Sequence, residues 1–174
     1  GSDKILKSMR RGLKSDGIRK RIYDLRNINP EIAIRTSIIV GYPGENENDF
    51  KNLYDFVEEM EFDRLGVFTY SEEEGTHGAI LNDDVPFNVK TERMDTIMLL
   101  QQDINLKKNK SRIGKIEKII IDRHSENGGS IGRSYRDSPD IDNYVRLDTL
   151  HTIGKFINVK ITDASEYDVK GVSI

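Results

Sequence analysis

The stretch that decides the fold of the first half of the chain is Arg35-Thr36-Ser37-Ile38-Ile39-Val40-Gly41-Tyr42-Pro43-Gly44-Glu45. It is rich in β-branched residues and nearly continuous in apolar character after Ser37, as is typical of a parallel strand covered on both faces. Glycines then flank a turn that Pro43 stiffens, which indicates the end of the strand. The stretch predicts a buried strand over residues 32–40 and a turn that lets the backbone approach a ligand.

Helical patterns lie on both sides of this strand. Before it, one short helix is expected with Ser2 or Asp3 as its cap, and a second with Ser15 or Asp16. After it, apolar residues recur at helical spacing, and a second strand is expected at 65–70. A long amphipathic helix then covers about 89–106. The first of the later helices carries Phe50, Leu53, Tyr54, Val57 and Met60 on one face.

This alternation is that of a parallel α/β layer, in which ligand sites lie beyond the carboxyl ends of the strands. Only two strands are visible, and two parallel strands with their helices can neither close a barrel nor cover both sheet edges. Residues 1–112 are therefore expected to be the last part of a larger α/β domain.

After Gly114 the pattern changes to short β-rich runs separated by turn residues. Five short strands in about 60 residues favour a small antiparallel barrel of the OB type. A second domain is therefore expected over 113–174. Its strands are expected at 116–121, 130–135, 144–147, 156–161 and 169–174.

The composition of the chain excludes several classes of function. With 27 Lys and Arg against 30 Asp and Glu, the net charge of −3 gives no global attraction to phosphate backbones. Cysteine is absent, which excludes disulfides, thiolate nucleophiles and iron–sulfur ligation by this chain. No apolar run is long enough to span a membrane, and the start shows no secretory pattern, so a cytoplasmic monomer is expected.

Each segment that could carry chemistry also has a plain structural reading. Residues 41–45 could be an ordinary strand-to-helix loop, and 71–76 an acidic solvated loop. The basic residues near the start could simply be a solvated helix face. In 132–142, Tyr and Arg suit nucleic acid, but the acids beside them would repel phosphate. Since residues 114–174 hold 9 basic and 10 acidic side chains, a basic protein partner fits better.

Taken in order, these segments resemble one family. Residues 1–11 and the stretch quoted first are followed by Asp63-Arg64-Leu65-Gly66-Val67-Phe68-Thr69-Tyr70-Ser71 with Glu74-Gly75-Thr76. Gly132-Arg133-Ser134-Tyr135 and Asp137-Ser138-Pro139-Asp140-Ile141-Asp142 complete the series. They look like consecutive blocks of the radical S-adenosylmethionine (SAM) methylthiotransferases. The last block and Glu166-Tyr167-Asp168-Val169-Lys170-Gly171 resemble the RimO type, which modifies an aspartate of a small-subunit ribosomal protein.

The resemblance implies an enzyme in three parts. An N-terminal cluster-binding domain precedes a TIM-like partial barrel with its own 4Fe–4S cluster, and a C-terminal TRAM domain holds the substrate. This chain would supply the last barrel strands (1–112) and the TRAM domain (113–174). Because both sets of cluster cysteines are missing, it would ligate neither cluster, contain no catalytic residue and be inactive alone.

The resemblance also implies residue roles. An acid is expected three residues after Gly41, but that position is Gly44, which puts a role for Glu45 in doubt. The residues that would contact SAM are Ser2, Arg10, Arg35, Ser37, Val40, Gly41, Pro43, Phe68, Thr69 and Tyr70. The residues that would hold the ribosomal protein are Arg133, Tyr135, Arg136, Asp137 and Asp142.

Two alternatives stay open. The parent enzyme could instead methylthiolate a transfer RNA adenosine. The chain could also be a free-standing module whose TRAM domain binds RNA, with the α/β half as a scaffold. RNA affinity that falls steeply with salt would separate this module from a protein-binding domain.

Overall fold

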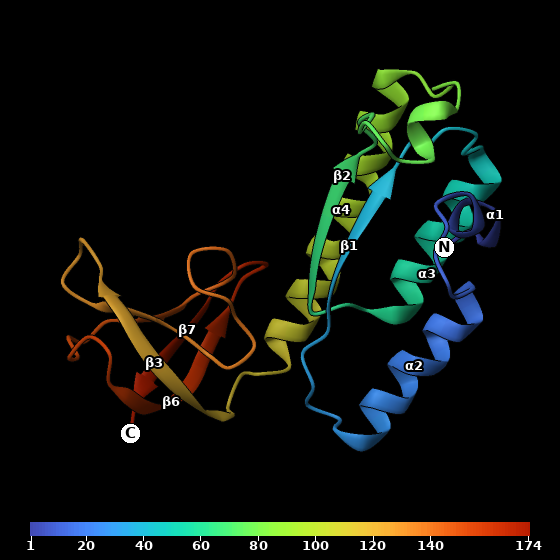
Figure 1. The fold of residues 1–174 in the computed structure, drawn as a ribbon. Helices are drawn as coiled ribbons and strands as arrows, with labels where there is room; N and C mark the ends of the chain where they lie inside the picture. The colour runs from blue at the N-terminus through green and yellow to red at the C-terminus, as the bar shows by residue number, and fades with distance from the viewer. The chain divides into compact units, whose positions relative to one another are not determined.

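The computed structural model describes all 174 residues. The chain divides into two compact units, Gly1–Gln101 and Gln102–Ile174 (Figure 1). No helix combines the length and the apolar character needed to cross a membrane.

The first unit has the expected order of helices and strands. Two helices precede the first strand, one lies between the strands, and a short 3-10 helix and a long helix follow them. The elements are α1 (Asp3–Ser8), α2 (Ser15–Ile28), β1 (Arg35–Val40), α3 (Glu47–Met60), β2 (Arg64–Thr69), η1 (Gly78–Ile80) and α4 (Phe87–Lys110).

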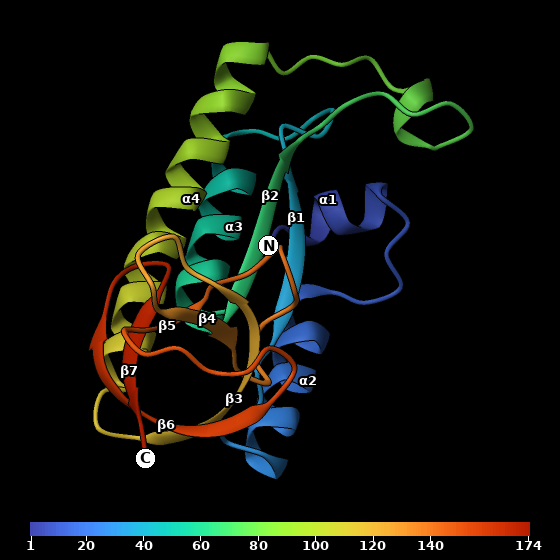
Figure 2. The ribbon, with the colours of Figure 1, turned by 90° about the vertical axis from the view of Figure 1, so that its left-hand side faces the viewer.

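The two strands are parallel, with register running from Arg35 opposite Arg64 to Val40 opposite Thr69. Figure 2 shows α3 and α4 on one side of the strands and α1 on the other. The prediction that β1 is covered on both faces is wrong, because Arg35 and Ser37 are exposed. Exposed residues alternate with the half-buried Thr36 and Ile38 over this half of the strand, so one of its faces packs against the helices and the other meets solvent.

The core of this unit lies where α2 and α3 meet the beginnings of the strands. Ile22, Phe56, Met60 and Phe62 form a buried cluster, and Ile34 packs against it. Farther along, Val40 and Ile97 are fully buried. The core therefore fixes one face of β1 and leaves the other free.

The helix caps follow the expectation in one case and depart from it in another. Ser2 is the N-cap of α1, as expected. The expected caps of α2 are wrong: the N-cap is Lys14, which makes no side-chain cap bond. Instead, the carboxylate of Asp3 accepts a hydrogen bond from the Ser15 backbone N–H at 2.7 Å. A residue 12 positions away thus satisfies a donor that a local cap would have served.

The second unit contains a closed five-stranded barrel, as expected in strand number. Its order is β3-β4-β5-β7-β6. The prediction of a wholly antiparallel barrel is wrong, because β5 and β7 are parallel. A closed ring with an odd number of strands cannot alternate in direction all the way around. The strands are β3 (Ile116–His124), β4 (Ser130–Arg133), β5 (Val145–Leu147), β6 (Phe156–Ala164) and β7 (Val169–Ser173).

Alternation along these strands fills the barrel. One side chain in two points inward, so the interior is packed with β-branched and leucine side chains. The buried cluster consists of Ile119, Ile121, Val145, Leu147, Val159, Ile161 and Val169.

Candidate functional site

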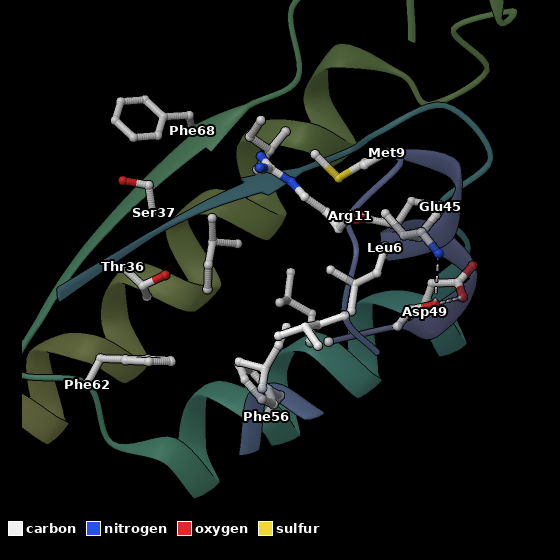
Figure 3. A pocket seen from close by; sticks show the side chains of 18 of the residues that line it. Leu6, Met9, Arg11, Thr36, Ser37, Glu45, Asp49, Phe56, Phe62 and Phe68 are labelled. Atoms are coloured by element: carbon white, nitrogen blue, oxygen red, sulfur yellow. Dashed lines mark hydrogen bonds between the residues drawn. The ribbon is translucent and has the colours of Figure 1, made fainter. Parts of the chain in front are cut away.

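The first unit contains a cavity of about 1150 Å³. All of its lining residues lie between Gly1 and Glu73, so it belongs wholly to this unit. Its walls come from α1, the α1–α2 connection, α2, β1, α3 and the end of β2 (Figure 3). A site of this size accommodates a ligand the size of a nucleoside or larger.

One part of the cavity lies along the open face of the strands. Ser37 and Phe68 point to one side of the sheet in Figure 3, while Thr36 points to the other, toward Phe56 and Phe62. The Phe68 ring is 57% exposed, which is unusual for a large aromatic side chain on a strand. Arg11 and Arg35 line the same cavity. This part therefore combines an accessible aromatic ring with guanidinium groups, which suit carboxylates.

The other part is apolar. It lies between α1, α2 and α3, where aliphatic and aromatic side chains form the wall. Polar side chains line the cavity both beside the strands and at the ends of the helices, so a ligand could be oriented from both sides. The apolar wall consists of Ile5, Leu6, Ile18, Ile22, Leu53, Phe56 and Phe62.

A buried carboxylate holds α1 against α3 at the edge of the cavity. Asp49 accepts hydrogen bonds from Ser2 Oγ at 2.6 Å and from Lys4 Nζ at 2.8 Å. It also completes the capping box of α3 by accepting from the Asn46 backbone N–H at 3.1 Å. Burial opposes ionisation, but the hydrogen bonds from Lys4, Ser2 and Asn46 outweigh it and lower the pKa of Asp49. Asp49 is therefore held as a carboxylate.

A second buried carboxylate holds the turn that follows β1. Glu45 Oε1 accepts from the Gly41 backbone N–H at 2.8 Å and from Arg93 Nη1 at 2.9 Å. Burial raises the pKa of Glu45, although the bonds from Gly41 and Arg93 act in the opposite direction. The side chain lines the cavity and has a structural role that the sequence alone did not reveal.

Five of the ten residues predicted to contact SAM line the cavity. Ser2 does so while its hydroxyl is bonded to Asp49. The others are Arg35, Ser37, Phe68 and Thr69.

The other five predicted residues do not line it. Arg10 is exposed, whereas its neighbour Arg11 contributes to the wall. Tyr70 packs edge-on against Tyr42, with ring centroids 5.2 Å apart. Val40, Gly41 and Pro43 are buried in the strand end and turn.

Several residues that line the cavity were not predicted from the sequence. Met9 and Arg11 belong to the basic segment at the start of the chain, but the direction in which each side chain points depends on how the helix ends. Ile39 lies between two predicted residues on β1, and Ser71 and Glu73 follow β2. Ligand sites of parallel α/β layers lie beyond the strand ends. The position of Ser71 and Glu73 just after a predicted strand was therefore the only indication in the sequence that they line the cavity.

The predicted substrate residues of the barrel fall into two groups. Tyr135 is 67% exposed, and the Arg136 guanidinium lies 5.0 Å from its ring centroid. The acids bond within their own loop: Asp137 accepts from Ser134 Oγ at 2.7 Å, and Asp142 from the Ser138 N–H at 2.6 Å. Arg133 is paired with Asp122. Tyr135 and Arg136 therefore form the outward pair, and the acids shape the loop that presents them.

No group of three or more His, Cys, Asp or Glu side chains is arranged to hold a metal ion. The chain has no cysteine, so it offers no thiolate to an iron–sulfur cluster. The chemistry available in the cavity is recognition by arginines, hydroxyls, an aromatic ring and apolar walls.

Comparison with known proteins identifies relatives along nearly the whole chain. Residues 113–174 match the TRAM domain family. The protein named ribosomal protein uS12 methylthiotransferase RimO of Flavobacterium johnsoniae is 47% identical over 173 residues, which cover 98% of this chain and 39% of the relative. The proteins of the same name from Acetivibrio thermocellus and Flavobacterium psychrophilum are 48% and 49% identical, again over 98% of this chain and over 38% and 40% of their own length.

The chain therefore spans about two fifths of the length of these relatives. Their blocks of similarity include both the α/β unit with its cavity and the barrel. By sequence, the chain is a homologue of the RimO-type ribosomal protein uS12 methylthiotransferases over almost all of its residues, and it carries a TRAM domain at 113–174.

Proposed function

We propose that this chain is part of a radical SAM methylthiotransferase that adds a methylthio group to an aspartate of ribosomal protein uS12. Residues 1–112 would form the last part of a TIM-like partial barrel and one wall of the SAM site. Residues 113–174, the TRAM domain, would hold the protein substrate. Both iron–sulfur clusters would be ligated by residues outside this chain, in the cytoplasm of the cell.

The observation that carries the proposal is the identity of 47–49% with RimO proteins over 98% of the chain. Similarity at this level covers the cavity as well as the TRAM domain. The α/β unit also suits a partial barrel, because its parallel strands pack against α3 and α4 on one face, while Arg35 and Ser37 are exposed on the other.

The cavity residues fit SAM by their chemistry. Arg11 and Arg35 offer guanidinium groups to a carboxylate, and the exposed Phe68 ring beside Ile39 offers a surface for an adenine. Ser37, on the same side of the strands as Phe68, supplies a hydroxyl for the ribose. When bound to a reduced cluster, SAM supplies the radical that activates an unreactive carbon. The residues of this chain would bind and orient it and exclude water.

The barrel suits a protein substrate. The 114–174 segment is nearly neutral, and its exposed Tyr135 stacks with the half-buried Arg136, two residue types enriched in protein interfaces. The loop that carries them is fixed by Asp137 and Asp142, so the pair is presented in one arrangement. Such preorganisation lowers the entropic cost of binding.

The test uses the full-length protein that carries this chain, reconstituted anaerobically with iron and sulfide. It would be incubated with SAM, a reductant and uS12. The proposal predicts 5′-deoxyadenosine release and a methylthio mass gain on one aspartate of uS12. If SAM is cleaved but only transfer RNA is modified when both are supplied, uS12 is not the substrate.

A second candidate function, RNA binding by the TRAM domain, is favoured by a different face of the barrel. Phe156 on β6 is 61% exposed, and Lys118 Nζ on β3 lies 5.0 Å from its ring centroid. An exposed ring beside a lysine is suited to stacking a base and pairing its phosphate. Titration of the protein with a single-stranded RNA oligomer at several salt concentrations distinguishes this candidate. A steep fall of affinity with salt that Lys118→Glu removes would favour it over the protein substrate.

A further inference from the structure

We propose that Glu45 and Arg93 are positioning residues of the proposed SAM site. Together they hold the turn of residues 41–45, and so fix the last part of β1, where Ile39 lines the cavity. The inference rests on the proposed function but concerns two residues that would contact no ligand through their charges.

The first step is the bond from Glu45 back to the strand end. Its carboxylate accepts a hydrogen bond from the Gly41 N–H at 2.8 Å, closing a loop of five residues. The turn within this loop is closed by the Glu45 N–H bonded to the Tyr42 carbonyl at 2.9 Å. Gly41 has a φ of +71°, which glycine adopts readily and other residues avoid. The Glu45 side chain therefore stabilises a backbone conformation that few sequences would hold unaided.

The second step is the link from Glu45 to α4. The Arg93 side chain is 5% exposed, and its Nη1 donates to both the carboxylate and the carbonyl of Glu45, at 2.9 and 3.2 Å. Its Nη2 pairs with Glu47 at 2.5 Å, and the guanidinium lies 5.3 Å from the centroid of the Phe50 ring. One arginine thus joins α4 to the turn and to the beginning of α3.

The turn has anchors other than Glu45, so a positioning role of Glu45 can be distinguished from a general effect on stability. The turn is anchored independently at Gly44, whose N–H donates to Asp84 at 2.7 Å and whose carbonyl accepts from Lys4 Nζ at 2.7 Å. Loss of the Glu45 carboxylate would therefore leave the turn attached while releasing Gly41. Val40 is bonded through its carbonyl to the Tyr70 N–H at 2.8 Å, so looseness at Gly41 would reach the ends of both strands.

The experiment compares Glu45→Ala with Glu45→Gln, which keeps an oxygen acceptor for the Gly41 N–H. The matched control is Glu117→Ala. Glu117 forms a two-pronged pair with buried Arg112 at 2.9 and 2.8 Å, but it belongs to the other unit and does not line the cavity. Two readouts are taken: hydrogen exchange of the Gly41 amide by NMR on this chain, and KM and kcat for SAM cleavage by the full-length holoenzyme.

Glu45→Ala is expected to accelerate exchange at Gly41 by about tenfold and to raise the KM for SAM by about tenfold, the factor that one lost hydrogen bond gives. The kcat should stay within about threefold, because no reacting group is removed. Glu45→Gln should restore most of both values, and Glu117→Ala should change neither. If Glu45→Ala does not fold, Arg93→Lys replaces it. This variant keeps the positive charge but loses the two-armed guanidinium, and it is also expected to raise the KM for SAM.

The positioning role of Glu45 and the proposed function can each be refuted separately. An unchanged KM and an unchanged Gly41 exchange rate in Glu45→Ala, in a holoenzyme that cleaves SAM, would overturn the positioning role alone. A rise in KM of equal size in Glu117→Ala would overturn it too, because the effect would then be general destabilisation. A wild-type holoenzyme that does not cleave SAM would refute the proposed function and the inference with it.

Discussion

At the scale of single residues, the carboxyl end of β1 is shaped by side chains that bond to backbone. Asp84 and Lys4 hold Gly44, and Glu45 holds Gly41. These side chains come from α1, from the turn itself and from the segment before α4. The stability lost on substituting a glycine of this turn should therefore depend on the atoms around it and not only on its backbone angles.

Gly41 and Gly44 provide a matched pair for this prediction. Both have positive φ, but a Cβ on Gly41 would lie 2.3 Å from Lys90 Cγ, whereas Gly44 has open space. Gly44→Ala should cost about 1 kcal/mol of stability from strain alone. Gly41→Ala should cost about 3 kcal/mol, because Lys90 is buried and paired with Asp83 and cannot move freely. Urea denaturation measures both, and equal losses would contradict the predicted clash.

Asp49 gives a prediction for pH. Its pKa is lowered in the folded chain, so its contribution to stability is present above the ordinary aspartate pKa of about 3.9 and is lost as the pH falls below it. Asp49→Asn should destabilise the α/β unit by about 1–3 kcal/mol at pH 7. The difference between wild type and variant should shrink as the pH falls below about 4. A difference that stays constant from pH 7 to pH 3 would show that the charge of Asp49 is not responsible.

Some of the candidate site was predictable at this scale, and some was not. The family resemblance singled out Arg35, Ser37 and Phe68, and all three line the cavity. Each lies on a strand, where the alternation of side chains fixes the direction in which it points. Arg10 and Arg11 could not be distinguished, because they follow the end of α1. There Arg10 adopts a φ of 56°, and it is Arg11 that reaches the cavity.

At the scale of elements, α2 is stabilised by a residue of the preceding helix. Asp3 accepts from the Ser15 N–H at 2.7 Å, and this bond lowers the pKa of Asp3. Asp3→Ala should therefore cost about 1 kcal/mol, as the loss of a helix cap does. Asp16→Ala, in the first turn of α2, should cost about 0.5 kcal/mol through the helix dipole and its long, exposed contact with Arg19. Equal losses in urea denaturation would argue against the long-range cap.

The element order was predictable from the sequence because apolar periodicity is a local property. The cap of α2 and the parallel pair β5–β7 were not, since both depend on contacts between distant segments. The number of barrel strands was predicted correctly, and the parallel pair follows once a ring of five strands is known to close.

At the scale of the whole chain, the two units offer groups suited to recognition. The chain offers a cavity with arginines and an exposed ring and a TRAM domain, but no thiolate ligand. Sequence pattern predicted two domains of different class, because one half alternates helices and strands and the other has only short strands. The volume and walls of the cavity required the structure, since its residues come from six separate segments.

The most direct test of the central claim is the mass of uS12 after incubation with the reconstituted full-length protein, SAM and a reductant. The account predicts that one aspartate of uS12 gains a methylthio group, and that Arg35→Met raises the KM for SAM by about tenfold through loss of a charged hydrogen bond. Cleavage of SAM with uS12 left unmodified would contradict the proposed substrate. An unchanged KM for SAM in Arg35→Met would contradict the assignment of the cavity as the SAM site.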